Sequence, residues 1–138
     1  MSNIDTAIYT SDELLFSELT PEEGAVIEGG ATLRLIRATA IRASADVFPG
    51  INGDDVYIKC NGNKIYGTNN NVKTGDTFSI GKSYQFSGTA SIRFFDADVL
   101  SDDPLGGFIV GSNPTGIKSA IISGSGSTYE VYYKVTAV

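Results

Sequence analysis

Residues 56–66 read VYIKCNGNKIY, two strand-like segments joined by a turn signal. The segments Val56 to Cys60 and Lys64 to Tyr66 are rich in the β-branched and aromatic residues that fit extended strands. Asn61-Gly62 lies between them and is a strong signal for a two-residue turn, because both residue types tolerate the positive φ angles of such turns. The stretch therefore predicts a β-hairpin.

Further short strands are predicted on both sides of this hairpin. Thr32 to Arg42 alternates with a period of two, which is typical of a strand, and a bend or bulge is expected near Ile36. The Asn run at 69–71 and the Ser-Gly run at 123–127 are predicted loops. Other strands are expected at 77–80, 83–86, 90–95, 108–110, 118–122 and 129–135. This spacing indicates an antiparallel β-sandwich or barrel.

The composition excludes several classes of function. The 138 residues contain no His and a single Cys, so neither a Ser-His nor a Cys-His pair can form, and we expect the protein not to be an enzyme. Cys60 is interpreted as a small, half-buried strand residue, with an intermolecular bridge or a metal ligand as alternatives. No apolar run approaches the roughly 18 residues that span a bilayer.

The charge divides the chain at Gly29-Gly30. Residues 1–30 hold seven of the 16 acids and no Lys or Arg, whereas residues 31–138 hold nine acids and all ten bases, a net charge of +1. The chain is acidic overall, at −6, and has no run of Lys or Arg, so we expect no nucleic-acid partner. We predict two parts, a short helical segment at 1–30 and a β-sandwich domain at 31–138.

The first segment carries the signals of a short amphipathic helix. Thr20 can cap the helix, Pro21 suits its first position, and Glu23 completes a capping box. The segment resembles the double-glycine leaders of bacterial exported peptides, and it departs from them at Gly24, where these leaders usually have leucine. The positions that carry the resemblance are Phe16, Leu19, Glu23, Ile27, Gly29 and Gly30.

The resemblance to a leader implies export. Such leaders are recognised by ABC transporters with a cysteine-peptidase domain, which cut after the second glycine, here Gly30. The mature protein would then begin at Ala31 and be secreted, extracellular or at the cell surface. The alternative is that residues 1–30 are an N-terminal helix and loop of the domain.

The acids of residues 31–138 are clustered. Seven of the eight Asp in this range fall in two predicted loops: Asp46, Asp54 and Asp55 in one, and Asp96, Asp98, Asp102 and Asp103 in the other. Carboxylates held close together repel one another unless a cation lies among them, and Ca²⁺ prefers oxygen ligands. The pattern favours a calcium site, and the alternative is that the clusters are ordinary polar turns.

Two segments resemble C2 domains, which are calcium-binding β-sandwiches. Residues 94–106 read FFDADVLSDDPLG, similar to the family's apolar pair followed by Asp-x-Asp, a hydroxyl residue, a further Asp and an apolar-Gly step. Residues 54–59 read DDVYIK, similar to the family's Ser-Asp-Pro-Tyr-Val-Lys strand with Val56 in place of proline. The resemblance covers about residues 31–110, and both loops differ in length from the usual pattern.

The C2 resemblance implies a set of Ca²⁺ ligands. They are Asp46, Asp55, Asp96, Asp98 and Asp103, with Ser101 as an accessory and with Asp54 and Asp102 as outer hydrogen-bond partners or substitutes. Membrane-binding C2 domains carry apolar residues at the tips of these loops, and Val47, Phe48, Val99 and Leu100 occupy comparable positions. The alternative is that these apolar residues anchor the loops against the sandwich.

Two functions follow from this sequence. The first is a secreted, calcium-dependent binding module for a membrane, a surface polysaccharide or a protein. The second is a self-assembling structural protein of the bacterial cell surface or extracellular matrix, stabilised by calcium, in which strands such as 129–135 pair between subunits. The basic residues Arg34, Arg37, Arg42, Lys59 and Lys64 are scattered along the chain and are interpreted as solvated strand faces.

Overall fold

The computed structural model describes residues 30–45 and 53–138. Within these ranges every helix or strand assigned is a β-strand, and none of the described residues forms a helix long and apolar enough to cross a membrane. In chain order the strands are β2 (Ala31–Arg42), β3 (Asp54–Cys60), β4 (Asn63–Val72), β5 (Thr77–Phe86), β6 (Thr89–Asp96), β7 (Asp103–Gly111), β8 (Lys118–Gly124) and β9 (Ser127–Ala137).

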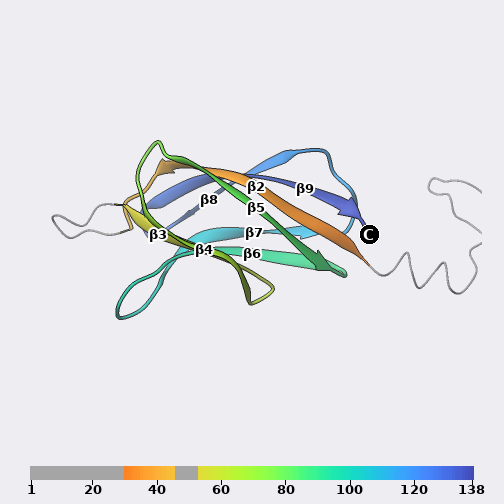
Figure 1. Cartoon of the computed structure of the whole chain (residues 1–138), viewed down its shortest axis with the longest axis horizontal. Helices are drawn as coiled ribbons and strands as arrows, with labels where there is room; N and C mark the ends of the chain where they lie inside the picture. The colour runs from red at the N-terminus through yellow and green to blue at the C-terminus, as the bar shows by residue number, and fades with distance from the viewer. Residues whose placement is uncertain (1–29, 46–52) are drawn as a thin grey trace, which may run out of the picture. The chain divides into compact units, whose positions relative to one another are not determined.

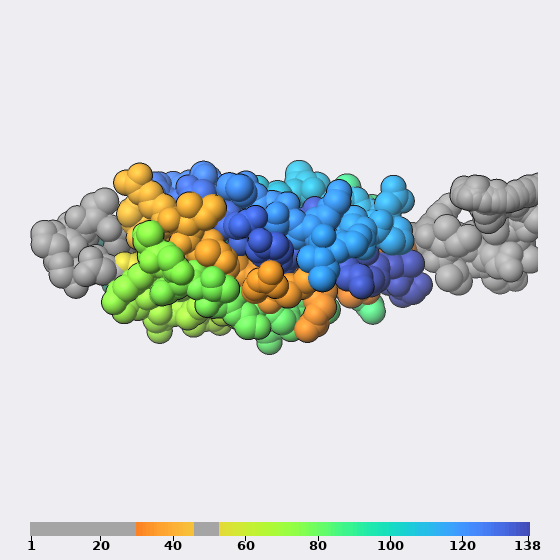
Figure 2. All heavy atoms as spheres, turned by 90° about the horizontal axis from the view of Figure 1, so that it is seen from above, coloured from red at the N-terminus to blue at the C-terminus, as the bar shows by residue number. Residues whose placement is uncertain are grey.

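The strands form two four-stranded sheets that face each other (Figure 1). One sheet has the order β5-β2-β9-β8 and the other the order β4-β3-β6-β7, and all neighbouring strands are antiparallel. Figure 2 shows β2 and β9, which lie far apart in the sequence, side by side on one face. The predicted fold class, an all-β antiparallel sandwich, is confirmed.

The bulge predicted in β2 is present. The pairing of β2 with both β5 and β9 shifts between Leu35 and Arg37, so that Ile36 is the additional residue. Leu33 and Leu35 are buried before the bulge and Ala38 after it, because the extra residue reverses which face the alternating side chains occupy.

The hairpin predicted at Asn61-Gly62 is also present. Both turn residues have positive φ, 48° at Asn61 and 84° at Gly62, which matches the twist of the strands that they join. Cys60 pairs with Asn63 directly across the turn, and Lys59 pairs with Lys64 one step further from it. The register therefore places the Lys59 and Lys64 side chains next to each other on neighbouring strands.

The prediction that residues 69–71 form a loop is wrong, because they belong to β4. This strand lies at the edge of its sheet, where exposed Asn side chains are tolerated, and three shifts in its pairing with β3 accommodate irregular backbone such as Asn71, at φ 64°. The loop predicted at 123–127 shrinks to a turn at Ser125 and Gly126, because Ser123 and Gly124 end β8.

The two strands predicted at 77–80 and 83–86 are one continuous strand, β5. Gly81, which lies between the two predicted ranges, has φ 63° and is located where the pairing of β5 with β2 shifts between Lys82 and Ser79. The glycine therefore forms part of a bulge opposite the one in β2, and the strand continues through it.

Strand β9 lies inside its sheet, between β2 and β8. Its residues pair with β2 on one side and with β8 on the other, so both rows of backbone hydrogen-bonding groups are used within the domain. The expectation that 129–135 pairs between subunits is therefore wrong. Edge strands such as β4 and β8 keep one unpaired side among the described residues.

The hydrophobic core fills the space between the two sheets. Its largest buried side chains are Tyr129 and Phe94, whose ring centroids lie 6.1 Å apart. Cys60 lies in a strand, as predicted, but it is fully rather than half buried, and burial raises the pKa of its thiol to about 11. Asp54, the first residue of β3, and Asp96, the last residue of β6, both point inward and are fully buried. Two carboxylates therefore lie at the edge of the apolar core.

Candidate metal centre

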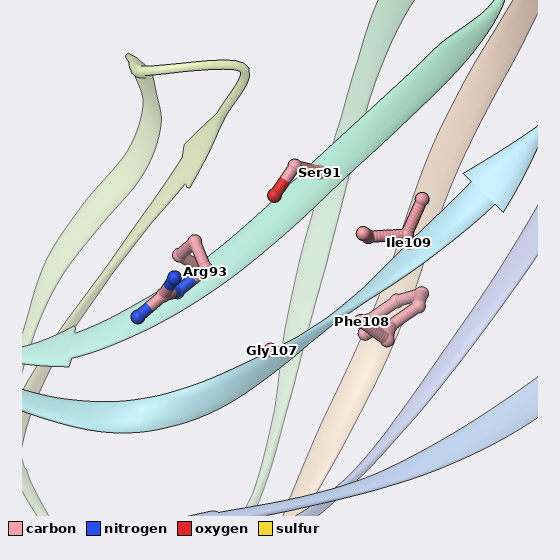
Figure 3. Close-up of a pocket in the computed structure, with 5 residues that line it drawn as sticks. All are labelled: Ser91, Arg93, Gly107, Phe108 and Ile109. Atoms are coloured by element: carbon pink, nitrogen blue, oxygen red, sulfur yellow. The ribbon is translucent and has the colours of Figure 1, made fainter.

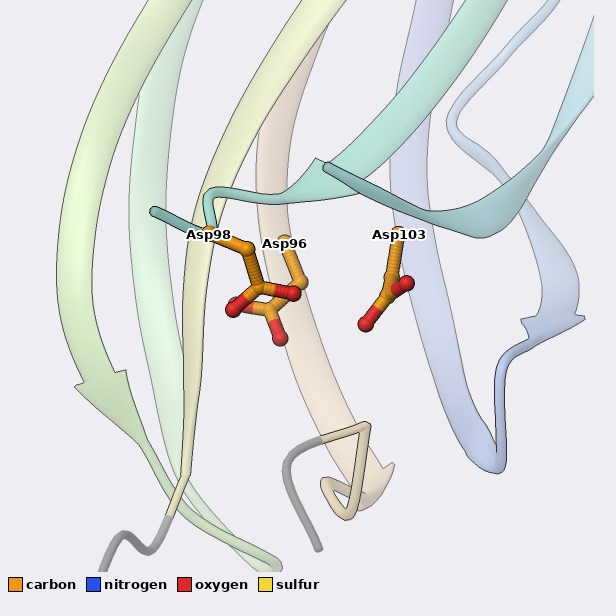
Figure 4. Close-up of side chains that lie close together, drawn as sticks. All are labelled: Asp96, Asp98 and Asp103. Atoms are coloured by element: carbon orange, nitrogen blue, oxygen red, sulfur yellow. The ribbon is translucent and has the colours of Figure 1, made fainter. Parts of the chain in front are cut away.

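Three of the predicted ligands come together where β6 ends and β7 begins. Asp96, Asp98 and Asp103 each offer a carboxylate oxygen, and the three oxygens lie within 4.8 Å of one another. Figure 4 shows the three side chains grouped at one end of the strands. Asp96 is fully buried, Asp103 is half-buried and Asp98 is exposed, so the group extends from the core to the solvent.

Strand pairing fixes the position of Asp96. It is the last residue of β6 and lies opposite Val56 of β3, facing inward as Phe94 does two residues earlier. The backbone N–H of Asp55 donates to Asp96 Oδ1 at 2.6 Å, and the N–H of Ala97 donates to the Asp55 carbonyl at 2.8 Å. These two bonds hold the carboxylate and the start of the loop to β3.

The carboxylates of Asp96, Asp98 and Asp103 repel one another when all three are ionised. Burial raises the pKa of the Asp103 carboxyl above its usual value. A hydrogen bond with Asp98 and the negative charges of Asp98, Asp102 and Asp54 raise this pKa further. A cation at this position would remove the repulsion between the carboxylates.

Asp102 makes contacts that differ from those of its neighbours. Its Oδ1 accepts the backbone N–H of Asp98 at 3.0 Å, and its Oδ2 accepts a hydrogen bond from the hydroxyl of Tyr57. The hydrogen bonds from Tyr57 and Asp98, together with the charges of Lys59 and Lys64, lower the pKa of Asp102. The carboxylate is thus held as an anion beside the outer face of β3.

Asp54 and Asp55 are adjacent in sequence but point in opposite directions. Asp54 is fully buried and accepts three hydrogen bonds, from Ser127 Oγ at 2.8 Å, Tyr129 OH at 2.6 Å and the Ala45 N–H at 3.0 Å. Asp55 Oδ1 accepts the N–H of Asn71 at 2.8 Å. Neither carboxylate joins the group formed by Asp96, Asp98 and Asp103.

The remaining predicted site residues are exposed or lie outside the described ranges. Ser101, Val99 and Leu100 are all exposed in the loop between β6 and β7, with Val99 at 100% and Leu100 at 97%. The alternative that Val99 and Leu100 anchor the loop is therefore wrong. Residues outside the description are Asp46, Val47 and Phe48 of the other loop, and Phe16, Leu19, Glu23, Ile27 and Gly29 of the leader; Gly30 directly precedes β2.

A row of three cations crosses the outer face of the sheet beside this loop. Lys59 of β3 lies directly opposite Lys64 of β4 on one side and Arg93 of β6 on the other. Like charges placed opposite each other destabilise a sheet, so the row is unfavourable without an anion. The expectation that Lys59 and Lys64 are scattered is wrong, because the hairpin register brings them together.

Two stacked aromatic rings support this row. The ring centroids of Tyr57 and Phe95 lie 5.2 Å apart at an interplanar angle of 18°. Lys64 Nζ lies 5.0 Å from the Tyr57 ring centroid, and Lys59 Nζ and Arg93 Cζ lie 5.8 Å and 5.9 Å from the Phe95 ring centroid. We call these five residues the cation–aromatic face.

An open hollow of about 380 Å³ continues this face toward the sheet edge (Figure 3). It is lined by Ser91 and Arg93 of β6 and by Gly107, Phe108 and Ile109 of β7. Gly107 lies opposite Arg93, and a Cβ at this position would lie 2.2 Å from the Ile92 carbonyl oxygen. The glycine therefore permits close approach of the two strands and leaves space beside the guanidinium.

The similarity to known proteins lies in the fold. No protein-family model matches the sequence, and no curated protein matches it. A solved C2 domain is similar with a TM-score of 0.51 and 17% identity, covering 77% of this chain and 96% of that domain. A C2 domain of plant extended synaptotagmin 1 gives 0.48 and 14%, covering 80% of this chain and 96% of that domain. The first similarity establishes a C2-like fold for this chain.

Proposed function

We propose that this protein is a calcium-dependent module that binds anionic membrane surfaces. The observation that carries the proposal is the group of Asp96, Asp98 and Asp103, whose oxygens lie within 4.8 Å of one another beside the exposed Val99-Leu100 tip. Two oxygens bound to one Ca²⁺ at about 2.3 to 2.6 Å lie no more than about 5 Å apart. The spacing of the three carboxylates is therefore suitable for a shared ion.

The chemistry of the donor set also fits calcium. Carboxylate oxygens are hard ligands, and the described residues around the group offer neither imidazole nor thiolate. Bound calcium would supply positive charge that can attract a phosphate group. Asp96 would hold the ion at the buried side and Asp98 at the solvent side, with Asp103 between these two depths.

The surface around the group supports a membrane as the partner. Val99 and Leu100 are exposed apolar side chains that can enter the boundary between headgroups and acyl chains. The cation–aromatic face adds three basic side chains, each of which contributes about 1 kcal/mol near an anionic bilayer. Apolar side chains suited to a lipid surface thus lie at one end of the domain, and basic side chains lie on one face of it.

Calcium binding is tested first in the absence of lipid. Adding millimolar Ca²⁺ to the full chain should raise its melting temperature, since a ligand of the native state stabilises that state. The double variant Asp96→Asn with Asp98→Asn should lose this response, and Glu130→Gln, one charge changed on the other sheet, should keep it. An unchanged melting temperature of the wild-type protein at millimolar Ca²⁺ would refute the calcium site.

Membrane binding is tested by sedimentation with vesicles. The wild-type protein with Ca²⁺ should bind vesicles of phosphatidylcholine and phosphatidylserine more tightly than pure phosphatidylcholine vesicles. Val99→Ser with Leu100→Ser should weaken this binding without changing the thermal response to Ca²⁺, because both side chains are exposed. Calcium binding without any vesicle binding would instead direct the search to a surface polysaccharide or a protein.

We also propose that residues 1–30 direct export through a peptidase-containing ABC transporter. The support is the sequence resemblance around Leu19, Glu23 and Gly29-Gly30, together with the confinement of the net negative charge to this segment. Mass spectrometry of the extracellular protein should find Ala31 at the N-terminus. Extracellular protein that retains Met1 or Ser2 would refute cleavage.

A further inference from the structure

The contact between Asp102 and Tyr57 links the calcium loop to the cation–aromatic face. Asp102 accepts from the Tyr57 hydroxyl with one oxygen and from the Asp98 N–H with the other, at 3.0 Å. Tyr57 is part of the cation–aromatic face, and Asp98 is one of the three grouped carboxylates. One carboxylate therefore contacts both halves of the proposed membrane-binding surface.

The surroundings of Asp102 are those of a bound anion. Its Oδ2 accepts the hydroxyl proton of Tyr57, whose ring centroid lies 5.0 Å from Lys64 Nζ, and Lys59 lies directly opposite Lys64. A phosphate or carboxylate of a lipid headgroup at the same place would be attracted by the same two ammonium groups and could accept the same hydroxyl proton. Asp102 and an external anion therefore need the same donors.

We propose that Asp102 is an internal competitor of the anionic headgroup, and that Ca²⁺ withdraws it from the Tyr57 hydroxyl. This inference rests on the proposed function. Asp102 lies between Ser101 and the half-buried Asp103 in a short exposed loop, and its backbone partner is Asp98. A cation bound by Asp98 and Asp103 would attract the adjacent Asp102 carboxylate toward itself and away from Tyr57. The basic side chains would then be available to the membrane only when calcium is bound.

The main test compares two variants that change the net charge equally. Asp102→Asn removes the internal anion, whereas Glu130→Gln removes one negative charge from the other sheet. In excess EDTA, Asp102→Asn should bind vesicles of phosphatidylcholine and phosphatidylserine about fivefold more tightly than Glu130→Gln, the effect of about one additional basic side chain at an anionic bilayer. Equal affinities of the two variants in EDTA would overturn the proposal.

A second variant distinguishes competition from simple support of the loop. Tyr57→Phe keeps the ring against Phe95 and removes only the hydroxyl that holds Asp102. If Tyr57 competes with Ca²⁺ for Asp102, calorimetric titration of Tyr57→Phe should show Ca²⁺ bound about threefold more tightly, the effect of about one modest hydrogen bond. If the hydroxyl merely supports the loop, the variant binds Ca²⁺ equally or more weakly, and the proposal is wrong.

The same experiments separate this inference from the proposed function. If Ca²⁺ does not raise the melting temperature of the wild-type protein, both the calcium site and the inference are refuted. A normal wild-type response, with Asp102→Asn equal to Glu130→Gln in EDTA, would refute the inference alone. Pure phosphatidylcholine vesicles serve as the lipid control, because the gain in Asp102→Asn should need anionic headgroups.

Discussion

Replacing Tyr129 with phenylalanine should lower the free energy of unfolding by about 1.5 to 3 kcal/mol, the range for a hydrogen bond to a charged group. The Tyr129 hydroxyl donates to Asp54 Oδ2 at 2.6 Å, and both side chains are fully buried. The ring would remain packed at 6.1 Å from Phe94, so the substitution removes the hydrogen bond with little change in packing. Asp54 would keep its bonds from Ser127 and Ala45.

A second Tyr-to-Phe substitution, at a half-buried position with a neutral hydrogen-bond partner, serves as the comparison. Tyr84→Phe removes a hydroxyl that accepts a bond from Asn63 Nδ2 at 3.2 Å on the exposed side of the domain. This variant should change the free energy of unfolding by no more than about 0.5 kcal/mol. The two phenylalanine variants differ in burial and in the charge of the hydroxyl's partner, and the expected difference in stability depends on these two quantities.

Urea denaturation of the full chain in excess EDTA measures both variants without interference from bound calcium. The slope of each transition should match the wild type, which would show that the extent of unfolding is unchanged. A double-mutant cycle of Tyr129→Phe with Asp54→Ala should give a coupling energy above about 0.5 kcal/mol, as expected for contacting residues. Equal losses in Tyr129→Phe and Tyr84→Phe would mean that the buried Asp54 carboxylate adds nothing to the Tyr129 hydrogen bond, and the prediction would be wrong.

Three further predictions concern the strands beside the site. Burial and the neighbouring Asp102 raise the pKa of Tyr57 from 10.0 to about 12. The Tyr57 hydroxyl therefore contributes fully to stability below pH 10.0, and this contribution is lost as the pH rises toward about 12. Tyr57→Phe should flatten this part of the alkaline stability profile, and a profile identical to the wild type would contradict the raised pKa of Tyr57. Gly67→Ala should destabilise more than Gly75→Ala by about 1 to 3 kcal/mol in urea melts, because both positions have positive φ but only at Gly67 would a Cβ clash, 2.6 Å from Tyr57 Cβ. Cys60 should react with a thiol reagent only when the domain opens, because its side chain is fully buried, and burial also raises its pKa to about 11; rapid labelling of the native protein would show that the strand is accessible.

The hairpin shows how much of the fold local sequence can predict. Asn61-Gly62 predicts the turn, and a two-residue turn determines that Cys60 faces Asn63 and that Lys59 faces Lys64. Extending that register along the hairpin is sufficient to place two of the three cations together from the sequence alone. The third cation, Arg93, is brought alongside by the pairing of β3 with β6, which joins residues more than 30 positions apart and has no local signal.

The wrong expectations share a physical cause. Asn69 to Asn71 and Gly81 favour turns when they are considered alone, yet each lies in a strand whose pairing contains a bulge. Tertiary pairing overrides local preference at such positions, because the neighbouring strand satisfies the backbone groups that a turn would otherwise satisfy. The interior position of β9 likewise depends on strand order, which periodicity along the chain does not determine.

The grouped carboxylates were predictable because they are close in sequence. Asp96 ends β6, Asp98 lies in the following loop and Asp103 begins β7 opposite Asp96, so the pairing of two consecutive strands brings them near one another. Asp54 and Asp55 belonged to the same prediction, but nothing in their immediate sequence separates their roles. Adjacent residues of a strand face opposite sides of the sheet, so one of the two had to enter the sandwich.

The hydrogen-bond partners of Asp54 indicate a structural role for this buried carboxylate. Ser127 and Tyr129 donate to it from β9, more than 70 residues later in the chain, and their spacing of two places both on the inward face of that strand. With these donors and the Ala45 N–H, the carboxylate is bonded on both oxygens inside the domain. An acid so engaged is better suited to joining β3 to β9 than to binding an ion, whereas the exposed Asp98 can change its contacts at little cost. The same residue type therefore serves stability at one end of β3 and, in our proposal, ion binding in the neighbouring loop, and the partners supplied by the opposite sheet make the difference.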